Sequence, residues 1–148
     1  MSLQENVNEQ LKAAMKAKDT VALESLRAIK TAIMMTQTQA GAKELSPDDE
    51  IKIVQKLVKQ RKDSAAIFIQ QGRVDLAEPE EAQIKIIEQF LPEQLDEATI
   101  SEIVVGIITK TGAAGMQDMG KVMGIASKVM AGKADGKTIS SIVRQKLS

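Results

Sequence analysis

Apolar residues recur every three or four positions along almost the whole chain, and no convincing stretch alternates apolar and polar residues with a period of two. The first spacing places side chains on one face of an α-helix, whereas a half-buried strand needs the second. We therefore predict an all-α protein. The expected apolar helix faces run over residues 3–14, 22–36, 51–68, 84–91, 100–108, 119–130 and 136–147.

Side chains suited to helix starts divide this pattern into about seven helices. Ser46 precedes Pro47 and three acidic residues, a typical helix start. The serine hydroxyl accepts from a free amide, proline suits the first helical position, and acids favour the positive end of the helix dipole. Further caps are expected at Asp19, Asp96 and Asp118, and a further helix start is expected at residues 78–81.

Pro92 interrupts the helical pattern in the segment FLPEQL, residues 90–95. Proline lacks an amide hydrogen and restricts the residue before it, so a helix rarely continues through such a segment. We predict a domain boundary here. An amino-terminal bundle of about four helices, residues 1–95, would be followed by a small three-helix carboxy-terminal domain, residues 96–148.

The chain contains no Cys, His, Trp or Tyr, and its only aromatic residues are two phenylalanines. The missing Cys excludes thiol nucleophiles and thiolate metal sites, and the missing His removes the commonest general base and metal ligand. Stacked aromatic rings that would bind single-stranded nucleic acid are not expected either. We therefore predict no metal, no cofactor and no catalytic residue.

The location of the chain is predicted from its hydropathy. No apolar run approaches the roughly 20 residues of a membrane span, and the opening segment MSLQENVNEQ lacks the basic-then-apolar order of a secretory signal. We therefore expect a cytoplasmic protein with no membrane partner.

The segment GKADGKT, residues 132–138, is nearly a Walker A phosphate loop. That loop has four residues between its glycines and follows a strand, whereas Gly132 and Gly136 are separated by three and follow a helical pattern. We predict a helix-to-helix turn, with Gly132 after one helix and Asp135 capping the next. The open helix amides beside two lysines would still suit a phosphodiester.

Small residues form a stripe at helical spacing just before this turn, and they are Gly120, Gly124, Ser127 and Ala131. Small side chains let another backbone approach closely. A neighbouring helix is the expected partner, and an RNA backbone is the alternative. The methionines at positions 116, 119, 123 and 130 are expected to fill the core.

The chain has 20 basic and 20 acidic side chains, but residues 103–148 carry seven basic and only two acidic ones. Such a surplus predicts phosphate contact with RNA, although lysines on outward helix faces are often simply solvated. The candidate RNA-binding residues are Lys121, Lys128, Lys133, Lys137, Arg144 and Lys146.

Arg61 falls within the apolar stripe of the third expected helix. A buried guanidinium needs an anionic partner, so we expect an inter-helix pair with a residue such as Glu24 or Glu88. The alternative is a second RNA contact at Lys59 and Lys62.

Four segments in the same order resemble the GatB/YqeY family, and they are KQRKDS at 59–64, FLPEQL at 90–95, DMGKVMG at 118–124 and GKADG at 132–136. The resemblance covers essentially the whole chain and implies an all-helical protein of two parts. Similar domains form the tail of the B subunit of the tRNA-dependent amidotransferase, a glutamine-dependent carbon–nitrogen ligase, where the tail helps to hold tRNA.

The resemblance therefore implies a tRNA-binding accessory protein that is non-catalytic by itself. One alternative is a protein-interaction module that docks on an amidotransferase or an aminoacyl-tRNA synthetase. Another is an enzyme that uses carboxylates and lysines alone.

Overall fold

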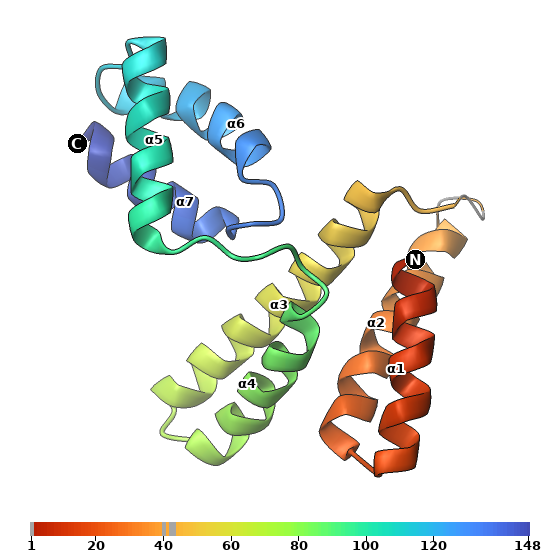
Figure 1. Cartoon of the computed structure of the whole chain (residues 1–148). Helices are drawn as coiled ribbons and strands as arrows, with labels where there is room; N and C mark the ends of the chain where they lie inside the picture. The colour runs from red at the N-terminus through yellow and green to blue at the C-terminus, as the bar shows by residue number, and fades with distance from the viewer. Residues whose placement is uncertain (1, 40, 42–43) are drawn as a thin grey trace. The chain divides into compact units, whose positions relative to one another are not determined.

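The computed structural model describes residues 2–39, 41 and 44–148. Over these residues the chain forms seven α-helices, one short 3-10 helix and no strand, which confirms the predicted all-α class. The helices divide into two compact units, Met1–Leu91 and Pro92–Ser148 (Figure 1). Each unit is described by itself below.

The first unit consists of two helical hairpins (Figure 1). Helix α1, Leu3–Ala17, packs against α2, Thr20–Gln39, and α3, Pro47–Gln70, packs along α4, Val74–Glu88. Helix α2 also contacts α3 and α4, which joins the hairpins around one apolar core. The buried members of this core are Leu3, Val7, Ala14, Ala22, Leu26, Ile29, Ile33, Ile53, Val54, Val58, Ile84 and Ile87.

The predicted helix caps at Ser46, Asp19 and Asp96 are confirmed. The Ser46 hydroxyl accepts from the Asp49 amide at 3.1 Å, and the Asp49 carboxylate accepts from the Ser46 amide at 3.1 Å. This second bond holds the pKa of Asp49 below its ordinary value. The Asp19 carboxylate accepts from the Ala22 amide, and the Asp96 carboxylate accepts from the Thr99 amide, which lowers the pKa of Asp96.

The start of α4 differs from the prediction. The helix begins at Val74 rather than at Glu78, and Pro79 lies inside it on the exposed side. Gly72, with a φ of 72°, turns the chain tightly out of α3, and the Arg73 carbonyl accepts from the Ala77 amide to open the new helix. The tight turn therefore places α4 against α3 about one helical turn earlier than the proline pattern indicated.

The second unit is a three-helix arrangement of α5, Glu97–Thr111, α6, Met119–Val129, and α7, Gly136–Leu147, with each helix contacting the other two. A 3-10 helix, Met116–Asp118, leads into α6. A separate apolar core joins them, and its buried members are Ile100, Val104, Ile107, Val122, Ala126, Met130, Ala134, Ile139, Ile142, Val143 and Leu147.

Asp118 does not cap α6 as the sequence predicted. Its side chain makes no hydrogen bond to the first amides of α6. The carboxylate instead accepts from the Ala114 amide at 2.8 Å, which closes the loop after α5. The 3-10 turn directs the aspartate backward into the loop.

The link, residues 92–96, leads into α5 and is hydrogen-bonded to the rest of the second unit. We predict a boundary after residue 95, whereas the two compact units divide between Leu91 and Pro92. The Leu95 amide donates to the Lys133 carbonyl at 2.9 Å, and the Gln94 side-chain amide donates to the Gly132 carbonyl at 2.8 Å. These two bonds attach the link to the turn between α6 and α7.

Candidate nucleic-acid interface

Helix α6 presents two of the candidate lysines to solvent. Val122 and Ala126 are buried against the core, while Lys121 and Lys128 are exposed. The two lysines are seven residues apart, about two turns of helix, and therefore share one face.

The turn between α6 and α7 holds a third lysine in a defined position. The Met130 carbonyl accepts from the Lys133 amide at 2.9 Å, and Gly132 is buried with a φ of 77°, a conformation that favours glycine. The carbonyls of Gly132 and Lys133 receive the two bonds from the link. The Lys133 side chain is exposed on a turn whose backbone is fixed from both sides.

Helix α7 begins with a capped first turn and an exposed lysine. The Asp135 carboxylate accepts from the Thr138 amide at 2.7 Å, and Gly136 is the first helical residue, with nothing within 4 Å of the position of a Cβ. Lys137 is exposed in this first turn. Because α6 precedes the segment and α7 follows it, GKADGKT is a helix-to-helix turn and lacks the strand of a phosphate loop.

Two further basic residues lie near the end of α7, and only one of them shares the face of Lys137. Arg144 and Lys146 are both exposed. Arg144 is seven residues after Lys137 and shares its face, whereas Lys146 lies nine residues after Lys137, close to the opposite side of the helix. The structure therefore does not bring Lys146 to the same face as Lys137 and Arg144.

The positive charge of the second unit is local to α6 and α7. Residues 92–148 carry seven basic and six acidic side chains, but residues 119–148 carry six basic and one acidic, a surplus of five. The single acid is the helix cap Asp135. The salt bridges between Lys59 and Asp63, Lys62 and Glu88, and Arg73 and Asp75 lie within the first unit.

The small-residue stripe on α6 is exposed. Gly120, Gly124, Ser127 and Ala131 all face solvent, and nothing lies within 4 Å of a Cβ built on either glycine. The neighbouring helix expected there is therefore not found within the second unit. The reason is that Val122, Ala126 and Met130 supply the buried face of α6, on its other side.

The methionines near α6 divide between core and surface. Met130 is fully buried, and Met119 and Met123 pack against the core while partly exposed. Met116 is 46% exposed. The expectation that they fill the core is thus met at three positions and not at Met116.

The residues of the alternative RNA contact in the first unit, Lys59 and Lys62, form salt bridges within that unit. The Arg61 Nε donates to the Gln83 side chain at 2.9 Å, and the Gln83 Nε2 donates to Glu24 at 3.1 Å, so glutamine relays the predicted inter-helix pair. Lys59 bridges to Asp63 at 3.4 Å and Lys62 to Glu88 at 3.5 Å.

Sequence reasoning missed the two residues that hold the turn. Gln94 and Leu95 were recognised only as part of a helix-breaking segment, yet they bond to the carbonyls of Gly132 and Lys133. A glutamine side chain after a proline carries free amide donors, but its partner lies 38 residues away along the chain. No local pattern predicts that pairing.

The fold and the candidate site thus define a class of protein: an all-helical chain of two units whose last two helices are basic. The chain belongs to the Yqey-like protein family, whose model matches residues 4–147. It is also related to part of a larger amidotransferase component. The E subunit of glutamyl-tRNA(Gln) amidotransferase from Thermococcus gammatolerans is 32% identical over 104 residues, which are 68% of this chain and 17% of that protein.

Other relatives carry the name altered inheritance of mitochondria protein 41, mitochondrial. The protein from Lachancea thermotolerans is 37% identical over 98 residues, 66% of this chain and 52% of that protein. The protein from Clavispora lusitaniae is 41% identical over 96 residues, 63% of this chain and 53% of that protein. The chain thus spans about half the length of these curated relatives.

These names contradict the predicted cytoplasmic location, because several relatives are named as mitochondrial proteins. The prediction was wrong because hydropathy and charge do not distinguish one aqueous compartment from another. Within the described residues, no helix is both long enough and apolar enough to cross a membrane.

Proposed function

We propose that this chain is a tRNA-binding accessory protein that performs no chemistry by itself. The observation that carries the proposal is the surplus of five positive charges on α6, the following turn and α7, all six basic side chains being exposed. The relationship to an amidotransferase component whose name includes glutamyl-tRNA(Gln) supports tRNA as the RNA.

The chemistry of these side chains favours contact with phosphates. Lysine and arginine neutralise phosphate charges and release counterions, which gives sequence-tolerant binding that weakens with salt. Neither Phe68 nor Phe90 lies in the second unit, and the chain has no Trp or Tyr, so α6 and α7 offer no ring on which a base could stack. Recognition would therefore depend on the backbone of a folded RNA.

Crosslinking in cells tests this proposal. Tagged full-length chain is irradiated in cells, purified under denaturing conditions, and the attached RNA is sequenced. We expect tRNA to be enriched over messenger and ribosomal RNA. Enrichment should fall in a chain with Lys128, Lys133 and Lys137 changed to Glu, because the contacts are electrostatic. RNA recovered without tRNA enrichment, or none above an untagged control, would contradict the proposal.

A second candidate function is docking on an amidotransferase or an aminoacyl-tRNA synthetase. The exposed face of α6 favours it, because Gly120 and Gly124 leave space for another backbone, and Ile125 and Val129 are 36% and 55% exposed on the same helix. Exposed apolar and small residues together are typical of protein contacts. A stable complex with a purified amidotransferase that survives nuclease treatment would favour this function over RNA binding.

A further inference from the structure

A glutamine side chain from the link holds the turn between α6 and α7. The Gln94 Nε2 donates to the Gly132 carbonyl at 2.8 Å and to the Pro92 carbonyl at 2.8 Å. A carboxamide nitrogen carries two hydrogens, so each carbonyl can receive its own. Gln94 therefore joins the backbone of the link to the backbone of a turn that lies 38 residues later.

A main-chain bond runs beside this side-chain bond. The Leu95 amide donates to the Lys133 carbonyl at 2.9 Å, and the partly buried Leu95 side chain packs against the core of the second unit. Two consecutive residues of the link thus bind two consecutive carbonyls of the turn. We call the bonds from Gln94 and Leu95 to the carbonyls of Gly132 and Lys133 the link clamp.

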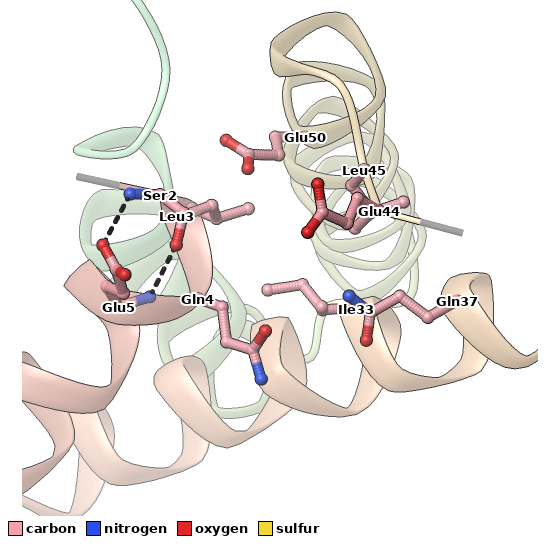
Figure 2. Close-up of a pocket in the computed structure, with 9 residues that line it drawn as sticks. All are labelled: Ser2, Leu3, Gln4, Glu5, Ile33, Gln37, Glu44, Leu45 and Glu50. Atoms are coloured by element: carbon pink, nitrogen blue, oxygen red, sulfur yellow. Dashed lines mark hydrogen bonds between the residues drawn. The ribbon is translucent and has the colours of Figure 1, made fainter. Parts of the chain in front are cut away.

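The link clamp differs in its reach from the helix caps of the first unit. Ser2 and Glu5 exchange hydrogen bonds across three residues at the start of α1, as the dashed lines in Figure 2 show. Ser46 and Asp49 form the same kind of pair at the start of α3. Such pairs satisfy the free amides of their own helix. The Gln94 side chain instead bonds to a carbonyl distant in sequence, so it fixes one segment against another.

The Lys133 side chain leaves the turn between two buried residues. Gly132 is buried and Ala134 is 7% exposed, whereas Lys133 itself is exposed. The φ of Gly132 is 77°, and the Met130 carbonyl accepts from the Lys133 amide at 2.9 Å. The amide and the carbonyl of Lys133 are therefore both bound. This fixes the direction of its backbone and of the bond from which its side chain extends.

We propose that Gln94 is a positioning residue for a phosphate contact made by Lys133. The inference rests on the proposed function, because the ligand is the RNA backbone. A lysine whose backbone is already ordered loses less conformational entropy when it binds, so more of its attraction to a phosphate remains as affinity. Gln94 carries no charge and acts only through the turn.

Replacing Gln94 with Met tests the link clamp in the absence of RNA, because methionine keeps the approximate side-chain length and removes both donors. Amide hydrogen exchange is followed by NMR on the isotope-labelled full chain. We expect the Leu95 and Lys133 amides to exchange at least about fivefold faster, the factor that matches the net strength of one hydrogen bond. The amides of Val104 and Ile107, in the core, should keep their rates.

The matched control is Gln60→Met, at an exposed position on α3 in the first unit. It removes the same carboxamide and should leave the exchange of the Leu95 and Lys133 amides unchanged.

The affinity for labelled tRNA near 0.15 M salt tests the positioning role. Gln94→Met and Lys133→Ala should each raise the Kd by about three- to tenfold. The double variant Q94M/K133A should bind within about twofold of K133A, because Gln94 acts through Lys133. Combined with Lys121→Ala, near the start of α6, the two losses should instead multiply.

The salt dependence separates positioning from a general loss of structure. Gln94→Met removes no charge, yet it should make the plot of log affinity against log salt less steep, by as much as about 0.7–0.9, the contribution of one phosphate contact.

Unchanged exchange at Leu95 and Lys133 in Q94M would overturn the proposal without reference to RNA. Equal affinity of Q94M and the parent chain for tRNA, or losses that multiply in Q94M/K133A, would overturn the positioning role while RNA binding by the parent chain stands. If the parent chain retains no tRNA, the proposed function fails and the positioning role fails with it, whatever the exchange rates are.

Discussion

Changing Lys128, Lys133 and Lys137 to Glu in one chain is expected to weaken tRNA binding by about tenfold or more near 0.15 M salt. The three lysines lie on the end of α6, the turn and the start of α7, and each is exposed. Each lysine that neutralises a phosphate contributes about 0.7–0.9 to the steepness of the plot of log affinity against log salt. The slope should therefore become less steep by about 2–3. Fluorescence anisotropy with labelled tRNA at several salt concentrations measures both quantities.

The control for this variant is a triple reversal of exposed lysines in the first unit. Changing Lys12, Lys16 and Lys85 to Glu alters the net charge of the chain by the same amount. If the interface lies on α6 and α7, this control should lose much less affinity and keep its salt slope. Equal losses in the two variants would show that net charge, and not a localised surface, attracts the RNA.

Replacing Ile29 with Ala is expected to destabilise the first unit by about 2–5 kcal/mol, the usual cost of removing a large aliphatic side chain from a packed core. Ile29 is fully buried, and its cluster shares no member with the cluster around Val104. The second unit should therefore keep its own stability. Urea unfolding followed by assigned amide resonances reports on each unit separately, which matters because the chain has no tryptophan.

The matched control for Ile29 is Ile69→Ala, at a position on α3 that is 53% exposed. Its effect should stay within about 0.5 kcal/mol, as for most surface substitutions. Two separate cores would be contradicted if both units unfolded together in the parent chain and in I29A. In that case the resonances of α6 and α7 would be lost at the same urea concentration as those of α1 and α2, in both proteins.

Local side-chain chemistry predicted most helix starts, and tertiary packing explains the exceptions. Ser46, Asp19 and Asp96 cap helices as expected, because a short oxygen-bearing side chain next to free amides has one dominant use. Pro79 suggested a helix start by the same reasoning. The tight turn at Gly72 places α4 against α3 from Val74 onward. Pro79 therefore lies on the solvent side, inside a helix that begins before it.

The candidate interface was predictable in part. The helical period of the buried residues places Lys121 and Lys128 on outward positions, and the structure has both exposed. Spacing alone did not show whether Gly120 and Gly124 pack against a helix or face solvent, because both uses need the same intervals. The bonds from Gln94 and Leu95 to the turn depend on a long-range contact that local sequence does not encode.

The proposed binding of tRNA phosphates to the exposed basic side chains of α6 and α7 is best tested by the salt dependence of tRNA binding to the unmodified full chain. We expect tRNA to be retained in dilute buffer and the logarithm of the affinity to fall linearly with the logarithm of the salt concentration, by about 0.7–0.9 for each phosphate neutralised. Failure to retain tRNA in dilute buffer, or binding that does not change with salt, would contradict it.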